Sequence, residues 1–207
     1  MRISRRAVGA VLLAIVVVIA GGVGFLYSGW YNMAADTPHT QVVYRLLTVL
    51  REESVARHAK RLDVPPLNDP ALVRSGAGNY DSMCVGCHLA PGLKDSELNR
   101  GLYPAPPRLD HPERQRTAAQ DFWIIKHGIK ASGMPAWGKS MEDQYIWGMV
   151  AFLEQLPKLS PEQYRELIAT SGGHQHGGGE TITPSAEKPA AKAGHDHHDD
   201  HSKPHTH

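Results

Sequence analysis

Two cysteines and a histidine in one short segment, Cys84-Val85-Gly86-Cys87-His88, carry the strongest chemical signal in the sequence. Two thiols separated by two residues can each add to a vinyl group of the same haem, and the histidine after the second thiol can bind the iron. A structural zinc site needs a second group of ligands nearby, and a thioredoxin-like dithiol needs a βαβ context. The sequence offers neither, so we predict one covalent haem c on Cys84 and Cys87, with His88 as an axial iron ligand.

A second iron ligand is predicted in the segment 132–135, which reads Ser-Gly-Met-Pro. Met134 lies between glycine and proline, outside any apolar periodicity, so core packing gives little reason for a methionine there. A thioether sulfur stabilises reduced haem iron. We therefore predict Met134 as the other axial ligand. His127 and His111 are the alternatives, although His127 ends a predicted helix, where it could simply interact with the helix dipole.

The N-terminus contains an uncharged apolar run over residues 7–27. As a helix this run would be roughly 32 Å long, enough to cross a bilayer. Three arginines precede it, Arg2, Arg5 and Arg6. No Lys or Arg follows it until Arg45. Aromatic residues stand where an interfacial belt is expected: Tyr27, Trp30 and Tyr31. We predict a single-pass anchor in the cell inner membrane, with the rest of the chain on the periplasmic side; a signal peptide cleaved near 33–35 is the alternative.

Helical periodicity and capping residues, with no strand signal or internal repeat, predict an all-α soluble part. The expected helices are an amphipathic one over 37–62, then 69–84, 117–127, one capped by Ser140 and running toward Pro157, and a short one from Ser160-Pro161. Met141 and Met149 are expected in the core. The predicted units are an anchor over 1–31, an amphipathic helix and linker over 32–68, the haem domain over 69–157, a short helix over 158–170 and a tail over 171–207.

The tail is rich in Gly, Ala, Pro and charged residues, and no part of it can bury a core, so we expect it to be disordered. It contains eight of the chain's 13 histidines: His174, His176, His195, His197, His198, His201, His205 and His207. Interleaved with Asp196, Asp199 and Asp200, these imidazoles are good loose ligands for Cu²⁺, Ni²⁺ or Zn²⁺. We favour metal binding over the alternative of a solubilising tail whose charge rises as the pH falls.

The segment 69–157 resembles a class I cytochrome c. The resemblance is carried by Gly76-x3-Tyr80-x3-Cys84-x2-Cys87-His88, the proline-rich loop, Gly133-Met134-Pro135 and the aromatic terminal helix. It implies a small helical domain around one haem, in which Gly76 and Tyr80 meet Phe152. It also implies that the carbonyl of Pro91 orients the haem histidine. Leu89 departs from the family, which usually has glycine after that histidine.

The global charge gives no reason to expect nucleic acid as a partner, because 22 Lys and Arg balance 21 Asp and Glu. A haem with both axial positions filled favours one-electron transfer between redox proteins over catalysis. We therefore expect a membrane-tethered electron carrier that is not itself an enzyme. The alternatives are a cytochrome subunit of a dehydrogenase or reductase complex, a peroxidase, and a metal-handling redox protein that uses the tail.

Overall fold

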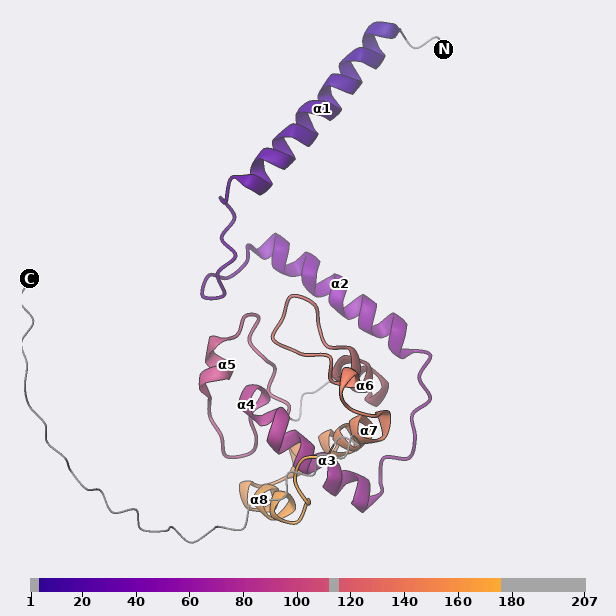
Figure 1. The fold of residues 1–207 in the computed structure, drawn as a ribbon, viewed down its shortest axis with the longest axis vertical. Coiled ribbons are helices and arrows are strands. Elements are labelled where there is room, and N and C mark those ends of the chain that lie inside the picture. Colours follow the sequence, from indigo (N-terminus) through magenta and orange to yellow (C-terminus); the bar gives the residue numbers. More distant parts are fainter. Residues whose placement is uncertain (1–3, 112–115, 176–207) are drawn as a thin grey trace, which may run out of the picture.

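The computed structural model describes residues 4–111 and 116–175, and within them every regular element is a helix, as predicted (Figure 1). The N-terminal helices are α1 (Arg5–Tyr27), α2 (Gln41–Ala59) and α3 (Pro70–Met83). Next come α4 (Val85–His88), α5 (Glu97–Gly101) and α6 (Ala118–His127). The chain continues through the 3-10 turn η1 (Trp137–Lys139), α7 (Asp143–Leu153), the turn η2 (Leu156–Lys158) and α8 (Pro161–Ala169).

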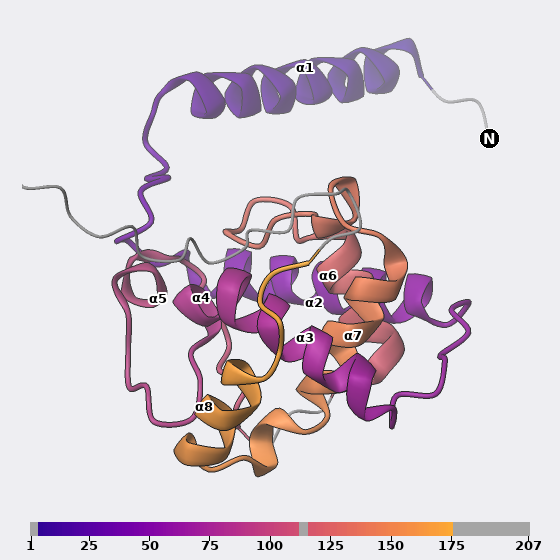
Figure 2. The ribbon, with the colours of Figure 1, turned by 60° about the horizontal axis from the view of Figure 1, so that its bottom comes forward.

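Helices α3 and α7 cross at the centre of the domain (Figure 2). The crossing is close because a Cβ atom added to Gly76 would collide with the backbone of Gly148. One turn further along, the rings of Tyr80 and Phe152 lie 5.2 Å apart between their centroids, and both side chains are fully buried. The contact of Gly76 and Tyr80 with the last long helix, expected from the resemblance, is therefore confirmed.

Two further helices complete the domain around this crossing. Helix α6 begins at a capping box in which Thr117 and Gln120 satisfy each other's backbone N–H groups. It ends at His127, as predicted, with Gly128 as its C-terminal cap. Helix α8 begins at the Ser160 capping box, and its Tyr164 hydroxyl donates a hydrogen bond to Asp81 of α3 at 2.7 Å. Met141 and Met149 are buried in the core, also as predicted.

Helix α2 lies along one side of the domain, across from α8 (Figure 1). Its C-terminal half packs on α6: Val55 and Ala59 are buried, and the His58 ring stacks on Trp123 with 5.4 Å between centroids. Its N-terminal half has no buried residue. Helix α1 has none either, and it is long and apolar enough to cross a membrane, a property that signal sequences share.

Several predicted boundaries are wrong. Helix α2 begins at Gln41, not at residue 37, because the residues before it are held by contacts with a distant loop through His39 and Tyr103. Helix α7 begins at Asp143 with Glu142 in the cap position, because Ser140 closes the η1 turn instead. It ends at Leu153, well before Pro157. Helices α4 and α5 were not predicted, since each is too short to show periodicity.

Candidate haem site

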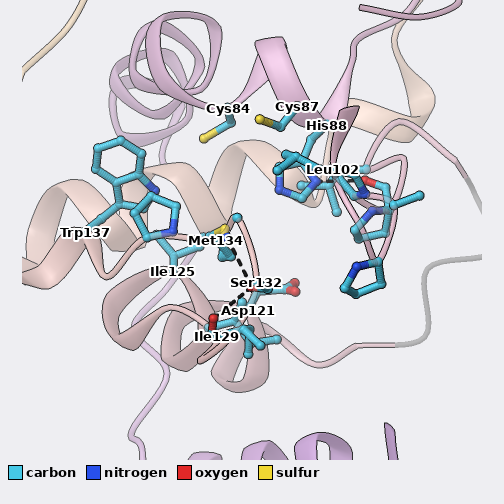
Figure 3. A pocket seen from close by; sticks show the side chains of 18 of the residues that line it. Cys84, Cys87, His88, Leu102, Asp121, Ile125, Ile129, Ser132, Met134 and Trp137 are labelled. Carbon is cyan, nitrogen blue, oxygen red and sulfur yellow. Dashed lines mark hydrogen bonds between the residues drawn. The ribbon is translucent and has the colours of Figure 1, made fainter. Parts of the chain in front are cut away.

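A cavity of about 350 Å³ lies between the Cys84–His88 segment, the loop 102–109, helix α6 and the segment 132–137. Cys84, Cys87 and His88 line it from one side, and Met134 lines it from another segment (Figure 3). Most of the remaining wall consists of aliphatic and proline side chains, among them Leu102, Pro107, Leu109, Ile124, Ile125, Ile129 and Leu153. An apolar cavity lined also by Cys84, Cys87, His88 and Met134 offers a covalently bound haem two thiols, two candidate iron ligands and an apolar wall.

The two thiols occupy adjacent positions on a tight turn. Cys84 is the C-terminal cap of α3, Cys87 lies in α4, and the Cys87 N–H donates to the Cys84 carbonyl at 3.0 Å. Burial, together with the nearby Cys87, raises the pKa of the Cys84 thiol to about 12. The thiol therefore stays neutral at ordinary pH, and neither cysteine forms a disulfide. The raised pKa of Cys84 is the opposite of the lowered thiol pKa of a redox-active dithiol, so the environment of Cys84 disfavours the thioredoxin alternative.

Helix α5, which the sequence did not predict, holds this turn in place. The Asn99 side chain donates a hydrogen bond to the Cys87 carbonyl at 2.7 Å, and the Ser96 hydroxyl donates to the Gly86 carbonyl. Ser96 also caps α5 by accepting from the Asn99 N–H at 3.0 Å. The backbone that carries both thiols is therefore fixed from outside the motif.

The imidazole of His88 is oriented by Pro107, whose carbonyl oxygen lies 2.8 Å from His88 Nδ1. A proton on Nδ1 satisfies this hydrogen bond and leaves Nε2 bare for a metal. Burial lowers the pKa of His88, and the Pro107 hydrogen bond opposes this effect only in part. The lowered pKa favours the neutral imidazole, which is the form that binds a metal. The expectation that Pro91 would play this part is wrong. The chain turns sharply after His88, with the Leu93 N–H bonded to the Ala90 carbonyl, and the loop 102–107 meets the histidine instead.

Leu89 has φ of 62° and ψ of −177°, a backbone conformation almost confined to glycine, in the position where the family usually has glycine. This conformation costs a leucine about 1–3 kcal/mol. The side chain is fully buried, and the Leu89 carbonyl accepts a hydrogen bond from the Tyr80 hydroxyl at 2.6 Å. The departure from the family therefore leaves the turn intact, because burial and the Tyr80 hydrogen bond hold the strained residue.

Met134 is half-buried on a loop that is closed at both ends. The Ile129 N–H donates to the Met134 carbonyl at 3.2 Å, and the Met134 N–H donates to the Ser132 hydroxyl at 3.1 Å. Gly128, with φ of 64°, lies against the backbone of 134–136, where a Cβ atom would come within 2.7 Å of the Met134 carbonyl. The loop therefore presents the thioether to the cavity. Neither alternative ligand, His111 or His127, lines the cavity.

Buried hydrogen-bond donors without acceptors also line the cavity. Arg116 Nη1 and Trp137 Nε1 are buried and have no hydrogen-bond partner among the described residues. Arg51 of α2 lines the same space, and Glu52 accepts from Arg51 at 2.9 Å and from Arg116 at 3.0 Å. Unsatisfied N–H groups beside an apolar cavity suit a flat apolar group with carboxylates at its edge, as haem has. The residues present therefore fit a haem.

The sequence did not indicate that Arg51, Arg116 and Trp137 line the cavity. Arg51 is one of several basic residues on α2, Arg116 precedes α6, and nothing in their spacing separates them from solvated charges. The predicted metal site in the tail lies outside the described residues except for His174, which is half-buried. Among the residues described, no cluster of three or more His, Cys, Asp or Glu could hold a metal ion.

The crossing of α3 and α7, the Cys-x-x-Cys-His turn and the methionine loop together define a class I cytochrome c domain, a haem-based electron-transfer domain with covalent haem c. Residues 71–153 match the family described as Cytochrome C oxidase, cbb3-type, subunit III. No curated protein and no solved structure matches the chain. The matched segment runs from the first turn of α3 to the end of α7, so α1, α2 and α8 lie outside it.

Proposed function

We propose that this protein is a one-electron carrier tethered by α1 to the periplasmic face of the inner membrane, with His88 and Met134 as the axial ligands of one haem c. The observation that carries the proposal is that His88 and Met134 line the same cavity from different segments. The Pro107 carbonyl holds the His88 ring, and the Ser132 hydroxyl accepts from the Met134 N–H. Bound in this cavity, the haem supplies a redox centre that gains and loses one electron.

The protein's own residues would hold that centre in a form suited to electron transfer. Cys84 and Cys87 fix its position, and the Pro107 carbonyl fixes the plane and tautomer of His88. Met134 would close the other axial position and so exclude substrates from the iron. The thioether ligand and the apolar wall both favour the reduced form and a high potential.

The ligand set is tested by exposing the oxidised protein to cyanide and the reduced protein to carbon monoxide. Two protein ligands predict slow and incomplete binding of both, together with a redox titration that follows a one-electron curve. Rapid, stoichiometric binding to the untreated protein would mean an open iron position and would favour catalysis at the haem over electron transfer.

The anchor and its orientation are tested on membranes from cells that produce the full chain. We expect the haem to stay with the membranes after alkaline carbonate washing, and the purified protein to retain its first residues. Protease added to the outside of spheroplasts should digest the haem domain. A mature N-terminus near residues 33–35 and release of the haem by washing would show a cleaved signal peptide instead.

The family description favours a second candidate, in which the protein is the cytochrome subunit of an oxidoreductase complex, because the family is named for a subunit of an oxidase. Gentle detergent extraction followed by native electrophoresis distinguishes the two. A haem band at the mass of the single chain supports a free carrier, whereas comigration with a second redox protein supports the complex.

A further inference from the structure

Helix α2 has two faces with different surroundings. Tyr44 and Arg51 line the haem cavity. Successive residues of a helix are rotated by about 100°, so Val42, Leu46, Val49 and Leu50 gather on the opposite side. These four side chains, the outer stripe, are 69%, 66%, 61% and 68% exposed. A cluster of large exposed aliphatic side chains at helical spacing indicates a surface that is covered in the working protein.

The charges on the same face show which kind of surface would cover it. Residues 41–50 contain a single charged side chain, that of Arg45. Toward the C-terminal end, the face of the outer stripe continues into Arg57 and Lys60, which are both exposed, with Glu53 as its acidic member. An apolar stripe that continues into basic side chains is the pattern of a helix lying at the surface of an anionic bilayer.

The position of α2 in the chain brings it to a bilayer surface. Residues 28–40 connect α1 to α2, and this segment is not a free tether. The His39 N–H donates to the Tyr103 hydroxyl at 3.1 Å, and His39 Nδ1 lies 2.9 Å from the Tyr31 hydroxyl. The chain leaving α1 is thereby held against the loop that also carries Pro107. Trp30, at the start of the segment, is 84% exposed and stands where an interfacial aromatic residue would lie.

We propose that the outer stripe of α2 lies in the headgroup region of the same bilayer that α1 enters, with Arg57 and Lys60 against anionic headgroups. This inference rests on the membrane anchoring proposed above. It makes α2 a spacer about one helix diameter thick, roughly 10 Å, between the haem cavity and the lipid. The orientation of the haem relative to the membrane is then fixed, which suits electron exchange with a partner embedded in that membrane.

The test uses the full-length protein with its haem attached, in nanodiscs of phosphatidylcholine and phosphatidylglycerol. Because the chain's two cysteines are consumed by the haem, a newly introduced cysteine can be labelled alone with a nitroxide. Labels are placed in the outer stripe by Leu46→Cys and Leu50→Cys. A matched solvent control is Glu166→Cys on α8, across the domain from α2, and Val16→Cys reports on the anchor (Figure 1). The measured quantity is the accessibility of each label to oxygen, which concentrates in lipid, and to a water-soluble nickel complex.

We expect the labels at 46 and 50 to be several-fold less accessible to nickel than the label at 166, and more accessible to oxygen. Nickel accessibility at 46 and 50 equal to that at 166 would overturn the inference, and the anchoring would stand if the label at 16 still lay deep in lipid. Low accessibility to both reagents would mean that protein covers the stripe. Dipolar broadening between labels would identify that protein as a second copy, and either result rejects the lipid surface. A label at 16 that is open to nickel would refute the anchoring itself.

Discussion

Gly76 of α3 and Gly148 of α7 bring the backbones of their helices into direct contact, because a Cβ atom on Gly76 would collide with the Gly148 carbonyl. This contact is also part of the haem site. Cys84 caps the helix that contains Gly76, and Leu153, which lines the cavity, is the last residue of the helix that contains Gly148. The separation of the two helices therefore sets the distance between the Cys84 thiol, which would hold the haem, and the part of the cavity wall formed by Leu153.

Substitution of Gly76 by alanine should lower the free energy of unfolding by about 3 kcal/mol, because two helix backbones would have to move apart. Denaturant unfolding of the haem-loaded protein measures the change. Gly101→Ala is the matched control: a Cβ atom there meets nothing within 4 Å, so the free energy of unfolding should not fall and should instead rise by up to about 1 kcal/mol, because alanine favours the helix. Equal effects of the two substitutions would contradict the close crossing.

The hydroxyl of Tyr164 donates a hydrogen bond to Asp81 at 2.7 Å, so Tyr164→Phe should cost about 1 kcal/mol of stability at pH 7. Burial and the neighbouring carboxylate raise the pKa of Tyr164 above its ordinary value. The unfolded chain would lose this proton near pH 10, whereas the folded chain keeps it. Stability should therefore fall as the pH rises above about 10, and the Phe variant should show less of this decline.

Unfolding midpoints at pH 7 and at pH 11 measure both effects. Tyr145→Phe serves as the control, because no hydroxyl hydrogen bond of Tyr145 is found within the described parts of the chain. An alkaline decline of the same size in the Tyr164→Phe variant and in the unaltered protein would show that another group causes it.

Arg116 lines the haem cavity with a buried N–H group that has no hydrogen-bond partner among the described residues, so Arg116→Gln should lower the reduction potential. A positive charge near the haem disfavours the oxidised state, and its removal reverses that effect. The expected decrease is tens of millivolts, corresponding to roughly 1 kcal/mol for one electron. Arg165→Gln on α8 removes the same charge at an exposed position away from the cavity, and it should leave the potential unchanged. Equal shifts in a redox titration would show that Arg116 acts only through the net charge.

The class of the domain and the residues that would bind the haem could be predicted because they depend on local spacing. The Cys84–His88 segment brings its groups together within one helical turn. Met134 could be identified because its glycine and proline neighbours place it outside any helix, where core packing does not explain a methionine. The starts of α3, α6 and α8 could be predicted for the same reason, since the caps at Asp69, Thr117 and Ser160 each act over only a few residues.

The features that could not be predicted depend on contacts between distant segments. The carbonyl that orients His88 comes from Pro107 because the strained turn at Leu89 redirects the chain, and that turn depends on the Tyr80 hydroxyl. Arg51 reaches the cavity only because α2 packs on α6. The start of α2 depends likewise on the contact between His39 and Tyr103.

The central claim, that His88 and Met134 hold the haem iron, is tested most directly by the far-red absorption of the oxidised protein. Substitution of methionine by leucine keeps the side-chain volume, so Met134→Leu should leave the fold intact, and Met141→Leu in the core is the matched control. We predict a weak sulfur-to-iron charge-transfer band in the unaltered protein and in Met141→Leu, and its loss in Met134→Leu. A band that survives in Met134→Leu, or that is absent from the unaltered protein, would contradict the assignment.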